Sequence, residues 1–117
     1  MREDIKAFLP LNPATLHILL ALAGEDRHGY GIMQEIARQS IGHYKIGPGT
    51  LYDNLQRLLD AGLVIESARV SETDSRRRYY RLTGFGRAVL SADLERLETA
   101  IREAKAQRLH KPHPRRT

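Results

Sequence analysis

The sequence predicts a mainly α-helical fold with one small β-hairpin and a long helix at the C-terminal end. Three observations predict it. Apolar residues recur at helical spacing in three segments that end before residue 62, strand-like stretches follow at 63–70 and 79–82, and apolar residues spaced three and four apart continue through 84–108. The chain has 117 residues, of which 41% are hydrophobic, so we expect one small domain.

The segment before the first helix is expected to be an N-terminal arm, residues 1–12. Its first eleven residues are interpreted as extended, with Pro10 near their end. Asn12 is a favourable N-cap, and Pro13 suits the first helical position, where its missing N–H costs nothing. The first helix is therefore expected over 13–23.

Two more helices and a hairpin follow. The second helix is expected over 29–39 with His28 as its cap, and the third over 48–61 with Gly62 as its C-terminal stop. The leucines of the third helix recur at helical spacing and should form a buried stripe: Leu51, Leu55, Leu58 and Leu59. The two strand-like stretches are expected to pair around a loop that is rich in charge.

The last helix is expected over 84–108, with Thr83 as its cap. It rises about 1.5 Å per residue and so extends roughly 37 Å, more than a domain of this size can cover. Its apolar seam covers about two heptads: Leu90, Leu94, Leu97 and Ile101. We predict that two copies pair through this dimerisation seam, helped by Phe8 of the arm. Residues 109–117 contain two prolines and no apolar period, so we expect a basic, disordered tail.

The net charge of +5 is located in the tail. The chain has 19 Lys and Arg against 14 Asp and Glu, and five of the basic residues lie in 105–117, where there is no acid. The rest of the chain is formally neutral, so only the arrangement of its charges can indicate nucleic-acid binding. No stretch approaches 18 consecutive apolar residues, and the N-terminus has no signal-peptide core, so we expect a cytoplasmic protein without a membrane span.

The predicted order of elements is three helices, a strand, a charged loop, a strand and a long helix. Residues 13–83 of this order correspond to a winged helix-turn-helix domain, in which the third helix enters the major groove and the hairpin reaches the DNA backbone or the minor groove. Some winged helices dock on proteins instead, so the order of elements leaves both functions open.

The candidate DNA contacts lie on the second helix, the third helix and the charged loop, or wing. Gly49 lets the third helix approach a phosphate closely, and helix N-termini attract anions. Polar side chains farther along can pair with base edges, and the wing arginines can reach phosphates. The candidates are Tyr30, Gly49, Thr50, Tyr52, Asn54, Gln56, Arg57, Arg76, Arg77 and Arg78. A solvated polar surface is the alternative for the helix and the wing, and both Tyr30 and Tyr52 also suit core packing.

Three motifs occur in order on the predicted elements. They are His-Gly-Tyr-Gly-Ile at 28–32, Gly-Pro-Gly-Thr-Leu-Tyr at 47–52 and Arg-Tyr-Tyr-Arg-Leu-Thr at 78–83. Together they resemble the PadR family of bacterial transcriptional regulators over about residues 11–100, and the single C-terminal helix resembles the compact branch of that family. The family often has Pro after the Tyr of the second motif, where this chain has Asp53.

The resemblance implies a transcriptional regulator that binds double-stranded DNA, a repressor in most relatives, whose DNA affinity falls when a small-molecule effector binds. With the dimerisation seam, it predicts a homodimer on a palindromic operator. The residues leave two alternatives open: a winged helix that binds a protein without a specific DNA site, and a nonspecific nucleic-acid binder that works through its tail.

No catalytic, metal or cofactor site is predicted. The five histidines form no compact ligand set, and no carboxylate pair or nucleophile with an adjacent base is evident. The Gly-Pro-Gly-Thr sequence at 47–50 lacks the Lys and the preceding strand that a nucleotide-binding loop requires.

Overall fold

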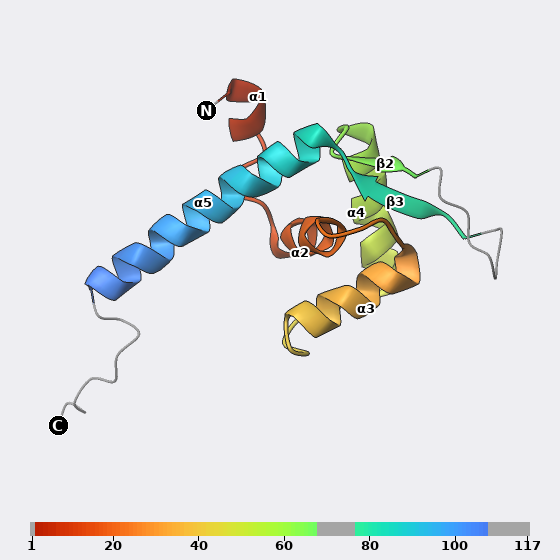
Figure 1. Ribbon diagram of the computed structural model, residues 1–117, viewed down its shortest axis with the longest axis horizontal. Helices are drawn as coiled ribbons and strands as arrows, with labels where there is room; N and C mark the ends of the chain where they lie inside the picture. Colours follow the sequence, from red (N-terminus) through yellow and green to blue (C-terminus); the bar gives the residue numbers. More distant parts are fainter. Residues whose placement is uncertain (1, 68–76, 108–117) are drawn as a thin grey trace.

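A computed structural model describes residues 2–67 and 77–107 of the chain (Figure 1). In these residues the protein forms five helices and one small sheet. The elements are, in order, α1 (Glu3–Lys6), α2 (Pro13–Leu22), β1 (Arg27–His28), α3 (Gly29–Gln39), α4 (Pro48–Asp60), β2 (Val64–Glu66), β3 (Tyr79–Leu82) and α5 (Gly84–Ala106). The predicted fold class, a winged helix-turn-helix followed by a long helix, is confirmed.

The predicted helix ends are set by local capping. Asn12 Oδ1 accepts a hydrogen bond from the Thr15 amide at 2.9 Å, and Thr83 Oγ1 accepts one from the Gly86 amide at 2.9 Å. Gly62 follows α4 with φ at 79°, the left-handed conformation that ends many helices. Helix α3 has the predicted bounds, and α2 and α4 each end one residue earlier than predicted.

The sheet has the order β1–β3–β2, and both pairs of strands are antiparallel. Strand β1 was not predicted, because two residues are too few for a period of two to be seen. It pairs His28 with Tyr79 and so joins the start of α3 to the wing. Tyr79 and Tyr80 are buried in the central strand. The first strand of the hairpin, predicted over 63–70, spans only Val64–Glu66 in the structure. Residues 68–76 lie outside the described residues.

The core lies between α2, α3, α4, the sheet and the first half of α5. The predicted stripe of α4 is confirmed, since Leu51, Leu55 and Leu58 are buried and Leu59 is half-buried. Full burial of one such side chain stabilises the fold by about 1.5–3 kcal/mol. A Cβ at Gly86 would overlap the carbonyl oxygen of Leu63, so this glycine lets α5 begin directly against the sheet.

The N-terminal segment differs from the extended arm that we predicted. Residues Glu3–Lys6 form one helical turn, and Ile5 is buried. The Phe8 ring contacts the Phe85 ring of α5 edge-on, with centroids 5.7 Å apart. Ile5 and Phe8 are shielded from water only if the N-terminal segment turns back onto α5. This long-range packing determines the conformation of the segment, because its local sequence favours no structure strongly. Phe8 thus already has a contact within its own chain.

Helix α5 begins in the core and leaves it along its length, and Figure 1 shows its second half projecting from the domain. Leu90 is 4% exposed, Leu94 and Leu97 are half-buried, and Ile101 is 55% exposed. The structure corrects the assignment of Leu90 to the dimerisation seam, because the chain's own core already covers it. Within residues 2–67 and 77–107, no helix is both long and apolar enough to cross a membrane.

Candidate nucleic-acid interface

The core determines which face of α4 is exposed. Leu51, Asn54, Leu55 and Leu58 are buried on one side of the helix. The exposed residues opposite them recur about one helical turn apart, at Gly49, Asp53, Gln56 and Asp60, and we call this row the outer stripe. Tyr52 and Arg57 flank it. A groove of DNA that meets α4 would meet the outer stripe first.

Asn54 does not belong to this face, and the structure corrects its assignment as a base contact. The side chain is 5% exposed, its Nδ2 donates to the Thr50 carbonyl at 2.8 Å, and its Oδ1 accepts from Thr15 Oγ1 at 3.3 Å. Asn54 lies three residues after Leu51 and four before Leu58, so helical phase already places it on the buried side. Its amide links α4 to α2.

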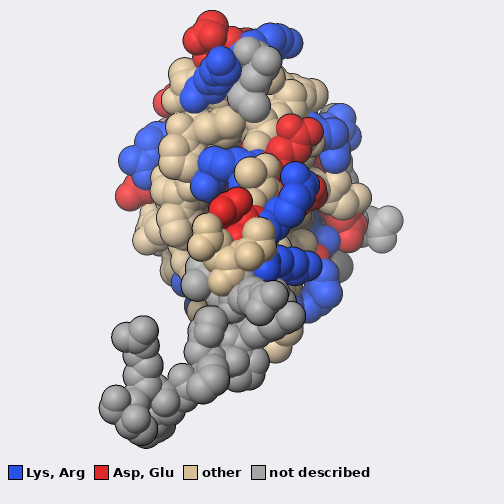
Figure 2. Space-filling model, turned by 90° about the vertical axis from the view of Figure 1, so that its left-hand side faces the viewer, with Lys and Arg blue, Asp and Glu red and all other residues tan. Residues whose placement is uncertain are grey.

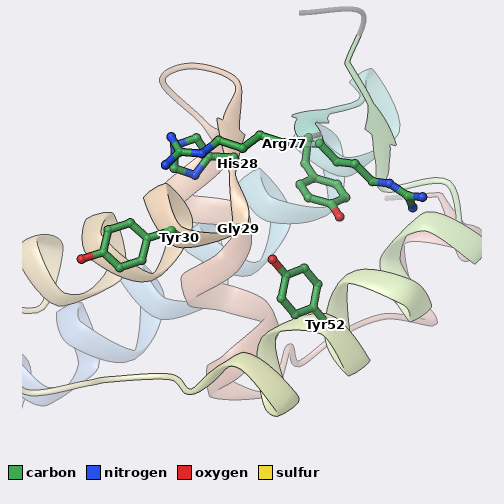
Figure 3. A pocket seen from close by; sticks show the side chains of 7 residues that line it. His28, Gly29, Tyr30, Tyr52 and Arg77 are labelled. Carbon is green, nitrogen blue, oxygen red and sulfur yellow. The ribbon is translucent and has the colours of Figure 1, made fainter. Parts of the chain in front are cut away.

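A pocket of about 410 Å³ opens beside α4, where the first turn of α3 and the residues before β3 approach Tyr52 (Figure 3). We call it the donor pocket, because its lining side chains carry hydroxyl, imidazole or guanidinium groups and none carries a carboxylate. Its lining residues are His28, Gly29, Tyr30, Tyr52, Arg77, Arg78 and Tyr80. The first turn of a helix also supplies unpaired amides and the positive end of the helix dipole. The donor pocket therefore suits an anion.

Tyr52 crosses from α4 to the start of α3. A Cβ at Gly29 would overlap the Tyr52 hydroxyl, so the absence of a side chain at Gly29 lets this hydroxyl lie against the first turn of α3. Figure 3 shows Tyr52 directed into the donor pocket and Tyr30 directed outward from α3. Both are exposed, at 49% and 60%, so neither is used as a core residue.

His28 joins the cap of α3 to the wing. Its Nδ1 accepts a hydrogen bond from the Gly31 amide at 3.0 Å, which confirms the predicted cap. Arg77 Nη1 lies 3.1 Å from His28 Nε2, within hydrogen-bond distance, so the wing guanidinium contacts the start of α3 at the edge of the pocket.

Arg78 and Tyr80 complete the pocket. Arg78 is exposed and its Nη1 lies 3.4 Å from Glu66 Oε1, which leaves most of the guanidinium accessible. Tyr80 is 6% exposed, and its burial, reinforced by the nearby Tyr52 and Glu66, raises its pKa. The phenol therefore stays neutral and keeps its proton as a donor. Tyr80 is not among the candidate contacts that the sequence suggested, because its place at the pocket depends on the pairing of β3 with both neighbouring strands.

The predicted site residues thus divide into two groups. Tyr30, Tyr52, Arg77 and Arg78 meet at the donor pocket. Gly49, Thr50, Gln56 and Arg57 are exposed on α4 itself, and Gln56 Nε2 donates to Asp60 Oδ1 at 3.0 Å. Arg76 lies outside the described residues. In the part of the chain that the structure describes, no group of three or more His, Asp or Glu side chains could hold a metal ion.

Comparisons with known proteins give one consistent result. Residues 18–92 match the model of the transcriptional regulator PadR-like family. A transcriptional regulator of Mycobacterium tuberculosis is 42% identical over 95 residues, which cover 81% of this chain and 85% of that protein. A solved transcriptional regulator from Clostridium thermocellum has 27% identity and a TM-score of 0.67, with 91% of this chain and 96% of that chain covered. Bacillus subtilis PadR in complex with operator DNA has a similar fold, with 21% identity, a TM-score of 0.64, and coverage of 91% and 52% of the two chains.

Proposed function

The chain belongs to the PadR-like family of transcriptional regulators, which are DNA-binding proteins and not enzymes, and from this premise we propose that it is a sequence-specific repressor that binds a palindromic operator as a homodimer. Such a regulator acts in the cytoplasm. The observation that carries the proposal is the position of the donor pocket next to the outer stripe of α4, because a DNA duplex needs both a phosphate site and a surface that reads base edges.

The donor pocket is proposed to bind a phosphate of the DNA backbone. The hydroxyl of Tyr52 and the guanidinium groups of Arg77 and Arg78 border it together with the first turn of α3. Hydrogen bonds in which one partner is charged contribute about 1.5–3 kcal/mol each. A phosphate held here would fix the position of the duplex and leave α4 to enter the major groove with its outer stripe toward the bases.

The projecting half of α5 supports the homodimer. Leu97 is half-buried and Ile101 is 55% exposed, and both lie on the predicted seam beyond the core. Figure 2 looks onto the C-terminal end of α5 and shows cationic and anionic side chains interspersed among the described residues there. A two-fold axis at this seam would present two copies of α4 to half-sites about one turn of DNA apart, roughly 34 Å.

A second pocket, of about 370 Å³, supports release of the DNA by a small-molecule effector. It lies behind α4 and is bordered by the N-terminal segment through Phe8 and Leu11 and by Arg57 and Leu58 of α4. Its volume falls in the range that binds small organic molecules. We propose that an apolar effector with one acidic or hydrogen-bond-accepting group, placed toward Arg57, occupies it and changes the position of α4.

The salt dependence of DNA binding tests the proposed interface. The operator is first selected from a random DNA pool, and the dissociation constants of wild type and of Arg77→Ala with Arg78→Ala are then measured over a range of salt concentrations. Each protomer of the dimer would hold one phosphate in its donor pocket, and each lost phosphate contact reduces the magnitude of the slope of log K against log salt by about 0.9, so we expect a reduction of about two for the dimer. The matched control is Arg102→Ala with Lys105→Ala, which removes the same charge from exposed positions of α5. An unchanged slope in the wing variant, or no selected sequence, would contradict the proposal.

A further inference from the structure

Asp53 occupies the middle of the outer stripe of α4. It lies four residues after Gly49 and three before Gln56, on the side opposite the buried leucines. The side chain is exposed, and within the described part of the chain it forms no ion pair or side-chain hydrogen bond. Arg57, one turn later, is the nearest basic residue on α4, but it does not pair with Asp53. A carboxylate without an internal partner therefore stands at the centre of the surface proposed to face DNA.

A carboxylate at this place has few favourable partners on a duplex. It can only accept hydrogen bonds, and every backbone phosphate repels it. In the major groove the donors are the amino groups at adenine N6 and cytosine N4. Adenine presents its N7 acceptor beside N6, which a carboxylate also disfavours, whereas cytosine presents N4 without an adjacent acceptor on the same base. Cytosine is therefore the base edge that complements an isolated aspartate.

The neighbouring residue on the outer stripe points to the same chemistry. The amide nitrogen of Gln56 donates one of its two N–H groups to Asp60 Oδ1 at 3.0 Å, which leaves the amide oxygen and the second N–H for an outside partner. Asp53 and Gln56 thus present acceptors from two successive turns of the outer stripe. This part of α4 is suited to base pairs that offer amino groups.

We propose that Asp53 is a specificity-determining residue that accepts a hydrogen bond from the N4 amino group of a cytosine in each operator half-site. The inference rests on the proposed function, because it requires the outer stripe to lie in the major groove. It adds what that function leaves open, the base that one residue of α4 selects.

Selection from a random DNA pool, followed by binding measurements on single-base variants of the selected site, tests this assignment. Wild type is compared with Asp53→Asn and Asp53→Ala, and Glu98→Gln on the exposed face of α5 controls for the loss of one negative charge. Wild type should prefer cytosine at one position of each half-site by about fivefold to 150-fold, the usual cost of one mismatched base pair in a specific site. Asp53→Ala should remove that preference. Asp53→Asn should change it to adenine, because an amide pairs with adenine N6 and N7.

The outcomes separate this inference from the proposed function. If wild type selects a site and both Asp53 variants keep its preference at every position, Asp53 reads no base and the inference is wrong. If both variants bind all sequences more tightly by one common factor, Asp53 only repels phosphates, which also overturns it. If wild type selects no sequence while it still binds DNA, the proposed function itself fails, and the reading of a base by Asp53 fails with it.

Discussion

Replacement of Gly29 by Ala should weaken DNA binding by displacing Tyr52. A Cβ at this position would overlap the Tyr52 hydroxyl and would lie 2.9 Å from ring carbon Cζ, so the tyrosine has to move. The ring is 49% exposed and can rotate toward solvent. The hydroxyl would then leave the donor pocket, while the backbone of α3 and the wing arginines keep their positions.

The structure bounds the size of this effect. Movement of a half-exposed ring costs little packing, and Gly29 is the first residue of α3, where the preference for Ala over Gly is smaller than the about 1 kcal/mol of helix interiors. The free energy of unfolding should therefore change by less than about 1 kcal/mol. A lost hydrogen bond between a hydroxyl and a phosphate costs about 1.5 kcal/mol at the lower end of its range, so the two protomers of the dimer lose about 3 kcal/mol together, which corresponds to roughly a 150-fold increase in Kd.

A double-mutant cycle measures whether Gly29 acts through Tyr52. Fluorescence anisotropy on the selected operator would give the Kd of wild type, Gly29→Ala, Tyr52→Phe and the double variant, with urea unfolding of each as the control for stability. Tyr52→Phe removes only the hydroxyl, so Gly29→Ala should cost little further affinity in that background. If Gly29→Ala causes the same loss with or without the hydroxyl, it acts through the backbone of α3, and our reasoning about Tyr52 is refuted.

Three further predictions concern strain, assembly and pH. Ile41 is 84% exposed with φ at 55°, so Ile41→Asn should raise the free energy of unfolding by about 1 kcal/mol in urea titrations, and no gain would show that the left-handed conformation is not strained. Ile101→Glu should shift the protein from dimer to monomer in sedimentation experiments at micromolar concentration, whereas Arg102→Glu should not, and equal dimerisation of both variants would contradict the seam. The hydrogen bond from Arg38, at 2.7 Å, lowers the pKa of Glu35 below its ordinary 4.5. The Glu35 carboxylate therefore stabilises the fold above that pH, and the stability difference between wild type and Glu35→Gln should shrink as the pH falls from about 5 to about 3. A difference that does not vary with pH would show that the ion pair does not contribute.

The helices of this protein could be predicted because their ends depend on nearby residues. Asn12, His28 and Thr83 each cap a helix through an amide three residues later, and Gly62 ends α4 by its own backbone conformation. Such signals act within one helical turn and are visible in the sequence. The error at Asn54 had a different origin, because its polarity suggested an outward position although its helical phase already indicated the buried side.

The donor pocket could not be predicted as a unit. Its residues come from three stretches, 28–30, 52 and 77–80, and they meet because β1, only two residues long, pairs with β3. Tyr80 has the same local pattern as any buried tyrosine in a strand. Its place at the pocket depends on the pairing of β3 with β1 and β2. The pocket also needs the close approach between Gly29 and Tyr52, which is a property of two separate helices.

A contact between α5 and the N-terminal segment joins the proposed dimerisation helix to the proposed effector pocket. Asp93 of α5 is fully buried, and its Oδ1 accepts from Arg96 Nε at 2.8 Å and from the Leu11 amide at 3.4 Å. Leu11 also borders the second pocket, behind α4. A ligand in that pocket would therefore contact both the helix that meets the DNA and a segment held by the helix that pairs the two copies. A ligand can lower DNA affinity only by its preference for one arrangement over another. Because both copies must meet half-sites at a fixed spacing, a small change in the angle between α4 and α5 would disfavour the DNA-bound arrangement, even if every contact of the donor pocket is kept.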